Sequence, residues 1–173
     1  RSLVGSEMCI RDRNSIADDI KILKQMKSLG EDDDIDVFDE AVYRISLNGD
    51  NSVIKELCQV LDDSTSTPSA MDNVIQCIFT IANRCGLEDG IYEILSNVDK
   101  ILINGKRCFI QINRMILNYE PFNNAYISAI KRLGDEELSS LIDILYQLKD
   151  KYNVIACTWD KVADISKDLI KDY

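Results

Sequence analysis

The sequence predicts an all-α protein. Apolar residues recur every three or four positions through most of the chain, and no segment keeps the two-residue alternation of a strand. Short turns containing glycine, asparagine or proline separate the apolar stretches, and helices joined by such turns lie nearly antiparallel. The predicted architecture is therefore a set of antiparallel helix pairs. It forms either a HEAT-like α-solenoid or a compact helical bundle, because no strict sequence repeat selects one of them.

The stretch from residue 71 to 85 is expected to be the central helix. Its apolar residues follow one helix face, which widens until little polar surface remains. A helix this apolar needs neighbours on several sides, so Phe79 is expected to be buried and Cys85 to pack in the core. Thr67 is placed to cap this helix, and Pro68 to be its first residue.

Three helices are expected before the central one. Ser15 precedes an acidic first turn, and the helix that it opens stops at Gly30. The last acids of the run over residues 31–36 can cap a second helix, whose inward face extends from residue 37 to 45. Asn48-Gly49 is expected to end it in a left-handed conformation. A third helix then starts at residue 50 or 51 and runs to about residue 61.

Further helices are expected after Gly86. One continues in broken form to residue 103, and Asn104-Gly105 separates it from a strongly apolar helix over 108–117. Pro121 interrupts the chain, because proline cannot continue a helix. The next helix covers 122–133, an acidic first turn opens another over 135–148, and Thr158 can cap a last helix that reaches residue 170.

Composition excludes several classes of function. The 173 residues carry a net charge of −10 and no histidine, so nucleic-acid binding is not expected. No apolar run approaches the roughly 20 residues of a membrane span, so membrane insertion is not expected either. The six cysteines form no CxxC pair, and we expect reduced thiols in a cytoplasmic protein.

Residues 2–13 resemble the in-frame translation of a sequencing adapter. We expect residues 1–13 to be a non-native, disordered segment. The remainder, residues 14–173, is long enough for one domain and is expected to form a single all-helical domain.

No catalytic, cofactor or metal site is predicted. Without histidine there is no histidine-based triad, and without paired cysteines there is no zinc site. Asp32, Asp34 and Asp36 alternate as calcium ligands do, but Val37 and Tyr43 occupy the positions where a calcium loop needs glycine and glutamate. The protein is therefore not expected to be an enzyme.

Two acidic runs are candidate partner-binding residues, with a solvated charged surface as the alternative. They comprise Asp32, Asp33, Asp34, Asp36, Asp62 and Asp63. Large aromatic residues are candidate interface anchors, or else half-buried residues between helices. They are Tyr119, Tyr126, Tyr146, Tyr152 and Trp159. The sequence does not predict an oligomeric state.

From residue 36 to about 152 the chain resembles the immunity protein 30 family of bacterial polymorphic toxin systems. The residues that carry the resemblance are Phe38-Asp39-Glu40-Ala41, Asn48-Gly49-Asp50, the stretches 53–63 and 74–81, and Arg114-Met115-Ile116-Leu117-Asn118. The resemblance implies a cytoplasmic helical protein that binds and neutralises a cognate toxin encoded beside it, without catalytic residues. A general helical-repeat scaffold or adaptor is the main alternative. An enzyme that uses scattered carboxylates is a weaker one.

Overall fold

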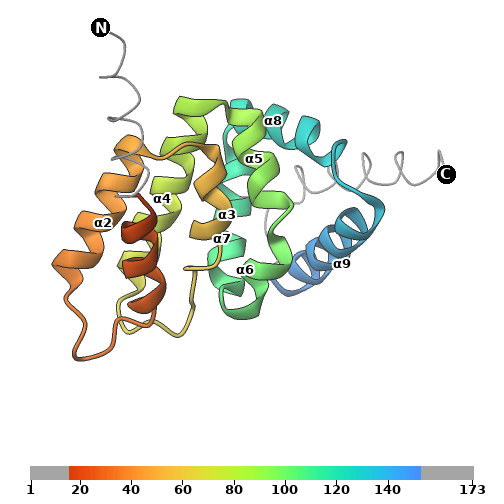
Figure 1. Cartoon of the computed structure of the whole chain (residues 1–173). Coiled ribbons are helices and arrows are strands. Elements are labelled where there is room, and N and C mark those ends of the chain that lie inside the picture. The colour runs from red at the N-terminus through yellow and green to blue at the C-terminus, as the bar shows by residue number, and fades with distance from the viewer. Residues whose placement is uncertain (1–15, 153–173) are drawn as a thin grey trace, which may run out of the picture.

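The computed structural model describes residues 16–152, and every regular element among them is a helix (Figure 1). This confirms the all-α prediction. A helix over residues 16–25 comes first, and the others are α2 (Ile35–Asn48), the 3₁₀ helix η1 (Asn51–Val53), α3 (Ile54–Leu57), α4 (Pro68–Cys85), α5 (Leu87–Leu95), α6 (Val98–Asn104), α7 (Lys106–Asn118), α8 (Glu120–Ile130) and α9 (Asp135–Tyr152). The adapter-like segment and the expected helix after Thr158 lie outside the described residues.

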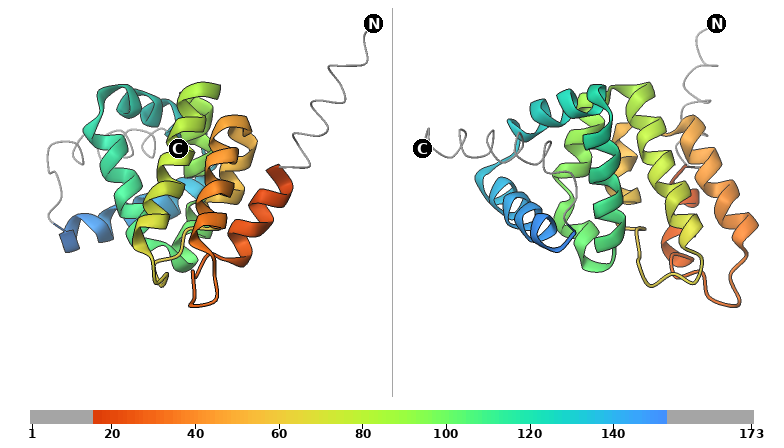
Figure 2. Two further views of the ribbon diagram at one scale, coloured as in Figure 1. Left: turned by 90° about the vertical axis from the view of Figure 1, so that its left-hand side faces the viewer. Right: turned by 180° about the vertical axis from the view of Figure 1, so that it is seen from behind.

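The helices form two adjoining rows. In one row α2 contacts α4 and α4 contacts α7; in the other, α3 contacts α5 and α5 contacts α8. Contacts of α4 with α3 and α5, and of α7 with α8, join the rows. The views in Figures 1 and 2 show this succession running from α2 at one end towards α8 and α9 at the other. The arrangement is therefore a stack of helix pairs that follow the order of the chain: α2 and α3, then α4 and α5, then α7 and α8.

The central helix is α4. It is flanked by α2, α3, α5 and α7, and Phe79 stacks on Phe122 of α8 with 5.0 Å between ring centroids and 9° between ring planes. Its buried side chains are Ala70, Met71, Val74, Ile75, Cys77, Ile78, Phe79, Ile81 and Ala82. The predicted central position and the predicted burial of Phe79 are confirmed.

The ends of α4 differ in part from expectation. Pro68 is its first residue, as predicted, but the Thr67 side chain makes no capping hydrogen bond. Cys85 is exposed, so the prediction that it packs in the core is wrong. The physical reason is its position: it is the last residue of α4, and the chain turns away at Gly86 before a neighbouring helix covers that turn.

Gly86 alone separates α4 from α5, and its φ of +122° lies in the region that favours glycine. Four residues on, α5 approaches α4 so closely that a Cβ on Gly90 would stand 2.3 Å from the Cβ of Ala82. The glycine there has a packing role, because any larger residue would push the two helices apart.

Two other expectations are wrong. The helix expected to reach residue 61 ends at Leu57, and the following turn places Cys58, Val60 and Leu61 all in the core, which one straight helix face would not do. Gly49 is not left-handed, since its φ is −69°. The glycine is needed there for space instead, because a Cβ would lie 2.7 Å from the carbonyl oxygen of Ile45.

Candidate functional site

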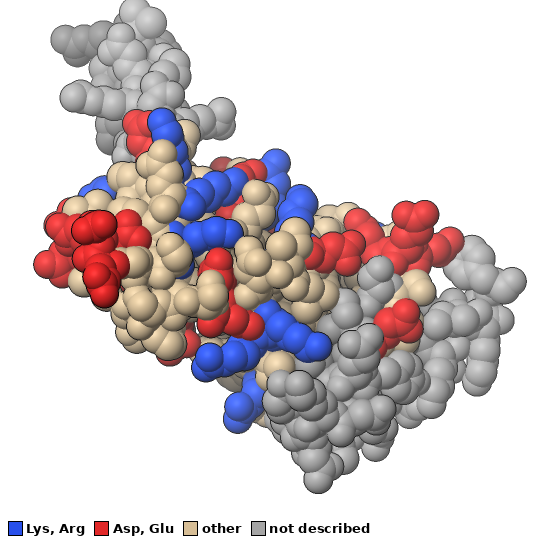
Figure 3. Space-filling view, turned by 90° about the horizontal axis from the view of Figure 1, so that it is seen from below, with Lys and Arg blue, Asp and Glu red and all other residues tan. Residues whose placement is uncertain are grey.

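The first acidic run forms the loop that leads into α2. Asp34 caps the helix: its Oδ1 accepts from the backbone N–H groups of Asp36 at 2.9 Å and Val37 at 3.4 Å. Asp33 closes the turn before it, since its Oδ2 accepts from the backbone N–H of Gly30 at 2.7 Å. Asp32 and Asp36 are exposed. Figure 3 shows acidic side chains gathered at this end of the molecule.

The second acidic run serves the fold. Asp62 is buried; its carboxylate accepts from the N–H (2.9 Å) and the hydroxyl (2.6 Å) of Ser64 and lies 3.6 Å from Nζ of Lys27. Burial raises the pKa of Asp62, but the hydrogen bonds from Ser64 and the positive charge of Lys27 outweigh it, so the pKa is lowered. Asp63 accepts from the backbone N–H groups of Arg107 at 2.6 Å and Cys108 at 3.2 Å, at the first turn of α7.

The structure brings the two runs to the same end of the molecule. The backbone N–H of Ser66 donates to the carbonyl of Ser28 at 3.1 Å, and its hydroxyl donates to the carbonyl of Leu29. The loop over 62–67 is thereby fastened to the turn that follows the first helix. The first run is the more open to solvent, because Asp62 is buried and Asp63 is half-buried, whereas Asp32, Asp34 and Asp36 are exposed.

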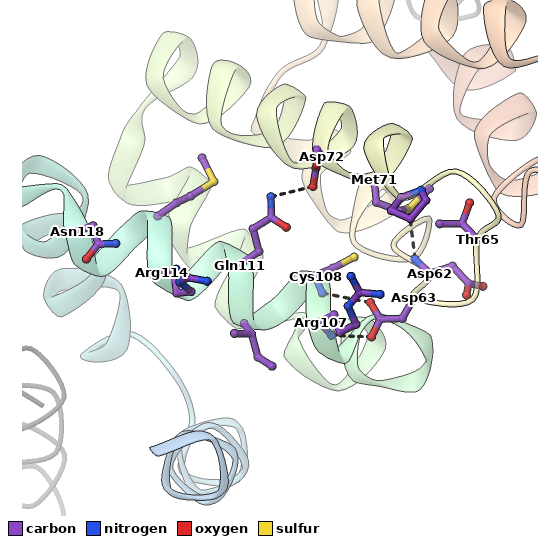
Figure 4. Close-up of a pocket in the computed structure, with 13 residues that line it drawn as sticks. Asp62, Asp63, Thr65, Met71, Asp72, Arg107, Cys108, Gln111, Arg114 and Asn118 are labelled. Atoms are coloured by element: carbon purple, nitrogen blue, oxygen red, sulfur yellow. Dashed lines mark hydrogen bonds between the residues drawn. The ribbon is translucent and has the colours of Figure 1, made fainter. Parts of the chain in front are cut away.

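A groove of about 760 Å³ lies between α4 and α7 (Figure 4). Asp72 on α4 accepts from Nε2 of Gln111 on α7 at 2.9 Å across it. Arg107 and Arg114 lie on the α7 side, are exposed, and form no ion pair within the described residues. Met71 and Met115 contribute apolar surface. The groove is thus mixed in character, with two cationic side chains available.

Sequence reasoning missed this groove, since its walls come from helices about 40 residues apart. One signal was present: Arg107, Gln111 and Arg114 recur at spacings of four and three, which places a polar stripe on an otherwise apolar helix. The spacing identifies a face, while the opposite wall appears only in the tertiary structure.

The aromatic candidates separate into two groups. Tyr119 is exposed and stays available as a contact residue. Tyr126 is fully buried, and its hydroxyl donates to Oδ1 of Asn113 at 3.1 Å, so its interpretation as an interface anchor is wrong. Burial also raises its pKa. The side chains of Tyr146 and Tyr152, and the whole of Trp159, lie outside the described part of the chain.

The remaining chemistry of the described residues is sparse. Within residues 16–152, no group of three or more histidine, cysteine, aspartate or glutamate side chains is placed to hold a metal ion. Burial raises the pKa of the Cys58, Cys77 and Cys108 thiols to about 12, which keeps them protonated at neutral pH. None of the described helices combines the length and apolar character that crossing a bilayer requires.

The fold and the surface together define an all-helical protein whose described surface offers charged and apolar contact areas. The chain belongs to the immunity protein 30 family, whose model matches residues 25–126. That match begins within the first described helix and ends in α8, whereas the resemblance read from the sequence began at residue 36 and extended to about 152. No curated protein and no solved structure matches the chain.

Proposed function

We propose that this protein binds and neutralises a cognate bacterial polymorphic toxin domain in the cytoplasm by stoichiometric protein–protein interaction, not by catalysis. The observation that carries the proposal is the family match over residues 25–126, which spans α2 to α7 and most of α8. Membership of an immunity family implies a protein partner. The identity of that partner as a toxin encoded beside this gene is our proposal.

The charge distribution supports a basic partner. The chain carries a net charge of −10, and its most concentrated acidic segment, residues 31–36, lies exposed at one end of the molecule. Complementary charge accelerates association between proteins and restricts the choice of partner. We propose that Asp32 and Asp36 act on the partner directly, while Asp33 and Asp34 hold the loop in shape.

Asp62 and Asp63 have an indirect part in this proposal. Their carboxylates hold the loop over 62–67 and the start of α7, and that loop in turn contacts the turn before the exposed acidic segment. They are thus proposed to support the binding surface without forming its contact area.

The test uses the toxin domain encoded next to this gene. Co-expression should restore growth of cells that the toxin alone kills, and calorimetry should give one protein bound per toxin domain. Toxin separated from the complex under mild denaturant should regain its activity, because binding changes no covalent bond. Absence of both protection and binding would reject the proposal, and permanent loss of toxin activity after separation would indicate an enzyme.

A further inference from the structure

The outward surface of α2 carries large apolar side chains without cover. Within the described residues, six large hydrophobic side chains are exposed, and four of them lie on this one helix. The four are Ile35, Val37, Tyr43 at 64% exposure and Leu47 at 54% exposure. Ile35 and Val37 lie in the first turn and project to opposite sides of the helix, whereas Tyr43 and Leu47, four positions apart, share one face. Soluble proteins leave exposed apolar side chains scattered singly, so two adjacent and strongly exposed ones indicate a contact surface.

The helical geometry places two of these residues in one stripe with two acids. Positions 36, 40, 43 and 47 follow spacings of four, three and four, so Asp36, Glu40, Tyr43 and Leu47 share a face. The opposite face packs into the core through Phe38, Ala41, Val42 and Ile45. All four side chains of the stripe are exposed, so no other part of the described chain covers it. Figures 1 and 2 show α2 at the end of its row, with the first helix beside it.

The stripe combines the chemistry of a binding surface. Tyrosine supplies a large rigid contact area with a polar tip, and it is enriched among the residues that dominate binding energy. Glu40 contacts Arg44 at 3.3 Å, but that arginine is held chiefly by Asp19, at 2.7 Å on the inner side. The stripe is therefore acidic over its N-terminal half, at Asp36 and Glu40, and this half continues into the exposed acidic loop before the helix.

We propose that this outer face of α2, which we call the α2 face and define as Asp36, Glu40, Tyr43 and Leu47, is where the toxin domain docks through a basic surface. The inference rests on the proposed immunity function and deepens it. Tyr43 and Leu47 form the desolvated centre of the contact. Asp36 and Glu40, together with the acidic loop, form its charged rim.

Charge selects a basic partner over a second copy of this chain. Two α2 faces brought together would place Asp36, Glu40 and the exposed acids of residues 31–34 of both copies near one another, and like charges in a contact oppose association. A partner surface rich in lysine and arginine would meet the same acids favourably and could cover Tyr43 and Leu47, which follow them along the stripe.

The test compares variants that remove exposed apolar groups at two separate places. Tyr43→Ala/Leu47→Ala alters the α2 face, and Ile103→Ala on α6 is the control, since Ile103 is 73% exposed elsewhere. Dissociation constants for the adjacent toxin domain are measured by calorimetry, with melting temperatures as a check on folding. We expect the α2 variant to bind at least about 100-fold more weakly, the control to change by less than about threefold, and both to fold normally.

The outcomes separate this inference from the proposed function. If the unaltered protein binds the toxin and the α2 variant binds equally well, the α2 face is not the docking surface and the immunity function stands. Equal losses in both variants would also reject the inference. Failure of the unaltered protein to bind rejects the function itself. If sedimentation shows that the unaltered protein dimerises, and the α2 variant is monomeric with unchanged toxin affinity, the occupant is a second copy and the proposal is overturned.

Discussion

The helices α4 and α2 lie side by side in the same row, yet their apolar residues have different roles. Around α4 the neighbours α2, α3, α5 and α7 cover the helix on several sides, and Phe79 is almost completely buried. Around α2 one side is covered and the other faces solvent, where Tyr43 and Leu47 remain exposed. An apolar side chain thus stabilises the fold at the centre of the stack and becomes available for binding at its end.

This difference shows why composition alone is a poor guide to a binding surface. Both helices contain large apolar residues at helical spacing, and only their position in the stack decides which are covered. The groove between α4 and α7 offers a second contrast, because its exposed arginines would suit an acidic segment while the α2 face suits a basic one. The following predictions test the distinction between covered and open positions.

The largest effect is expected at the covered centre. Phe79→Ala removes a buried ring that stacks on Phe122, and it should lower the free energy of unfolding by about 3–5 kcal/mol. Tyr43→Ala on the open face should change it by less than about 0.5 kcal/mol. Chemical denaturation of both variants measures the two values. Similar losses in both would show that α2 is not open, whereas a loss below about 1 kcal/mol for Phe79 would undo the central position of α4.

A smaller effect is expected where α4 and α5 touch. Gly90→Ala would place a methyl group 2.3 Å from Cβ of Ala82, and the overpacking should cost about 1–3 kcal/mol despite the better helix propensity of alanine. Gly30→Ala is the matched control, because its nearest neighbour would be Asp33 at 3.7 Å. Thermal unfolding of the two variants compares them. Greater or equal stability of the Gly90 variant would mean that the helices separate without penalty.

The acidic residues allow the same comparison between a covered and an open position, with an expected effect of about 1 kcal/mol on the free energy of unfolding. Asp62→Asn loses a buried charge held by Ser64 and Lys27, while Asp32→Asn alters an exposed one. Because the folded-state pKa of Asp62 is lowered, its stabilising contribution is present above the pKa of the unfolded chain and is lost as pH falls through the folded-state value.

The stability difference between the unaltered protein and Asp62→Asn should therefore be largest near neutral pH and should shrink below about pH 4. Denaturant unfolding at several pH values measures it. Asp32→Asn is the control at an exposed position. A pH-independent difference for Asp62→Asn would show that the charge of this carboxylate adds nothing to stability.

The smallest effect is expected on the rate of toxin binding. Glu31→Lys/Asp32→Lys reverses two exposed charges and should slow association by about threefold to tenfold at low salt and by less at high salt. Dissociation should change less. Asp33 and Asp34 are poorer choices, because they hold the loop and cap α2. Asp99→Lys/Asp143→Lys gives the same change in charge elsewhere. Surface plasmon resonance at two ionic strengths compares the association rates of the two double variants. Equal slowing in both would show that net charge, and not the position of the acidic loop, controls the rate.

Much of the fold follows from local pattern. The spacing of apolar residues predicted most of the helices, and the stop signals at Gly86, Gly105 and Pro121 fall where helices end or begin. The capping of α2 by a late acid of the run and the place of Pro68 as first residue of α4 were also predicted correctly. These features depend on residues within one or two turns of each other. Such interactions are the same whatever the rest of the chain does.

The candidate site was predicted only in part. The acidic run over 31–36 was recognised. For Asp62 the sequence offers one local partner, Ser64, but Lys27 lies far away along the chain, and so does Arg107, whose backbone N–H donates to Asp63. Tyr43 entered only as a residue unfit for a calcium loop. Its position off the buried face of α2 was a usable signal, because an apolar side chain on a polar helix face needs another explanation.

By itself the sequence determined where most helices lie, the acidic cap of α2 and the central place of α4, because hydrophobic periodicity and capping act between near neighbours in the chain. The tertiary structure decided which surfaces stay open. Cys85 is exposed where α4 ends, Asp62 is buried where two loops meet, and Tyr43 is uncovered where the row of helices stops. Coverage depends on what packs against a residue from elsewhere in the chain. Apolar residues at helical spacing look alike in the sequence of a central helix and of a terminal one, so the sequence does not show which of them stay uncovered.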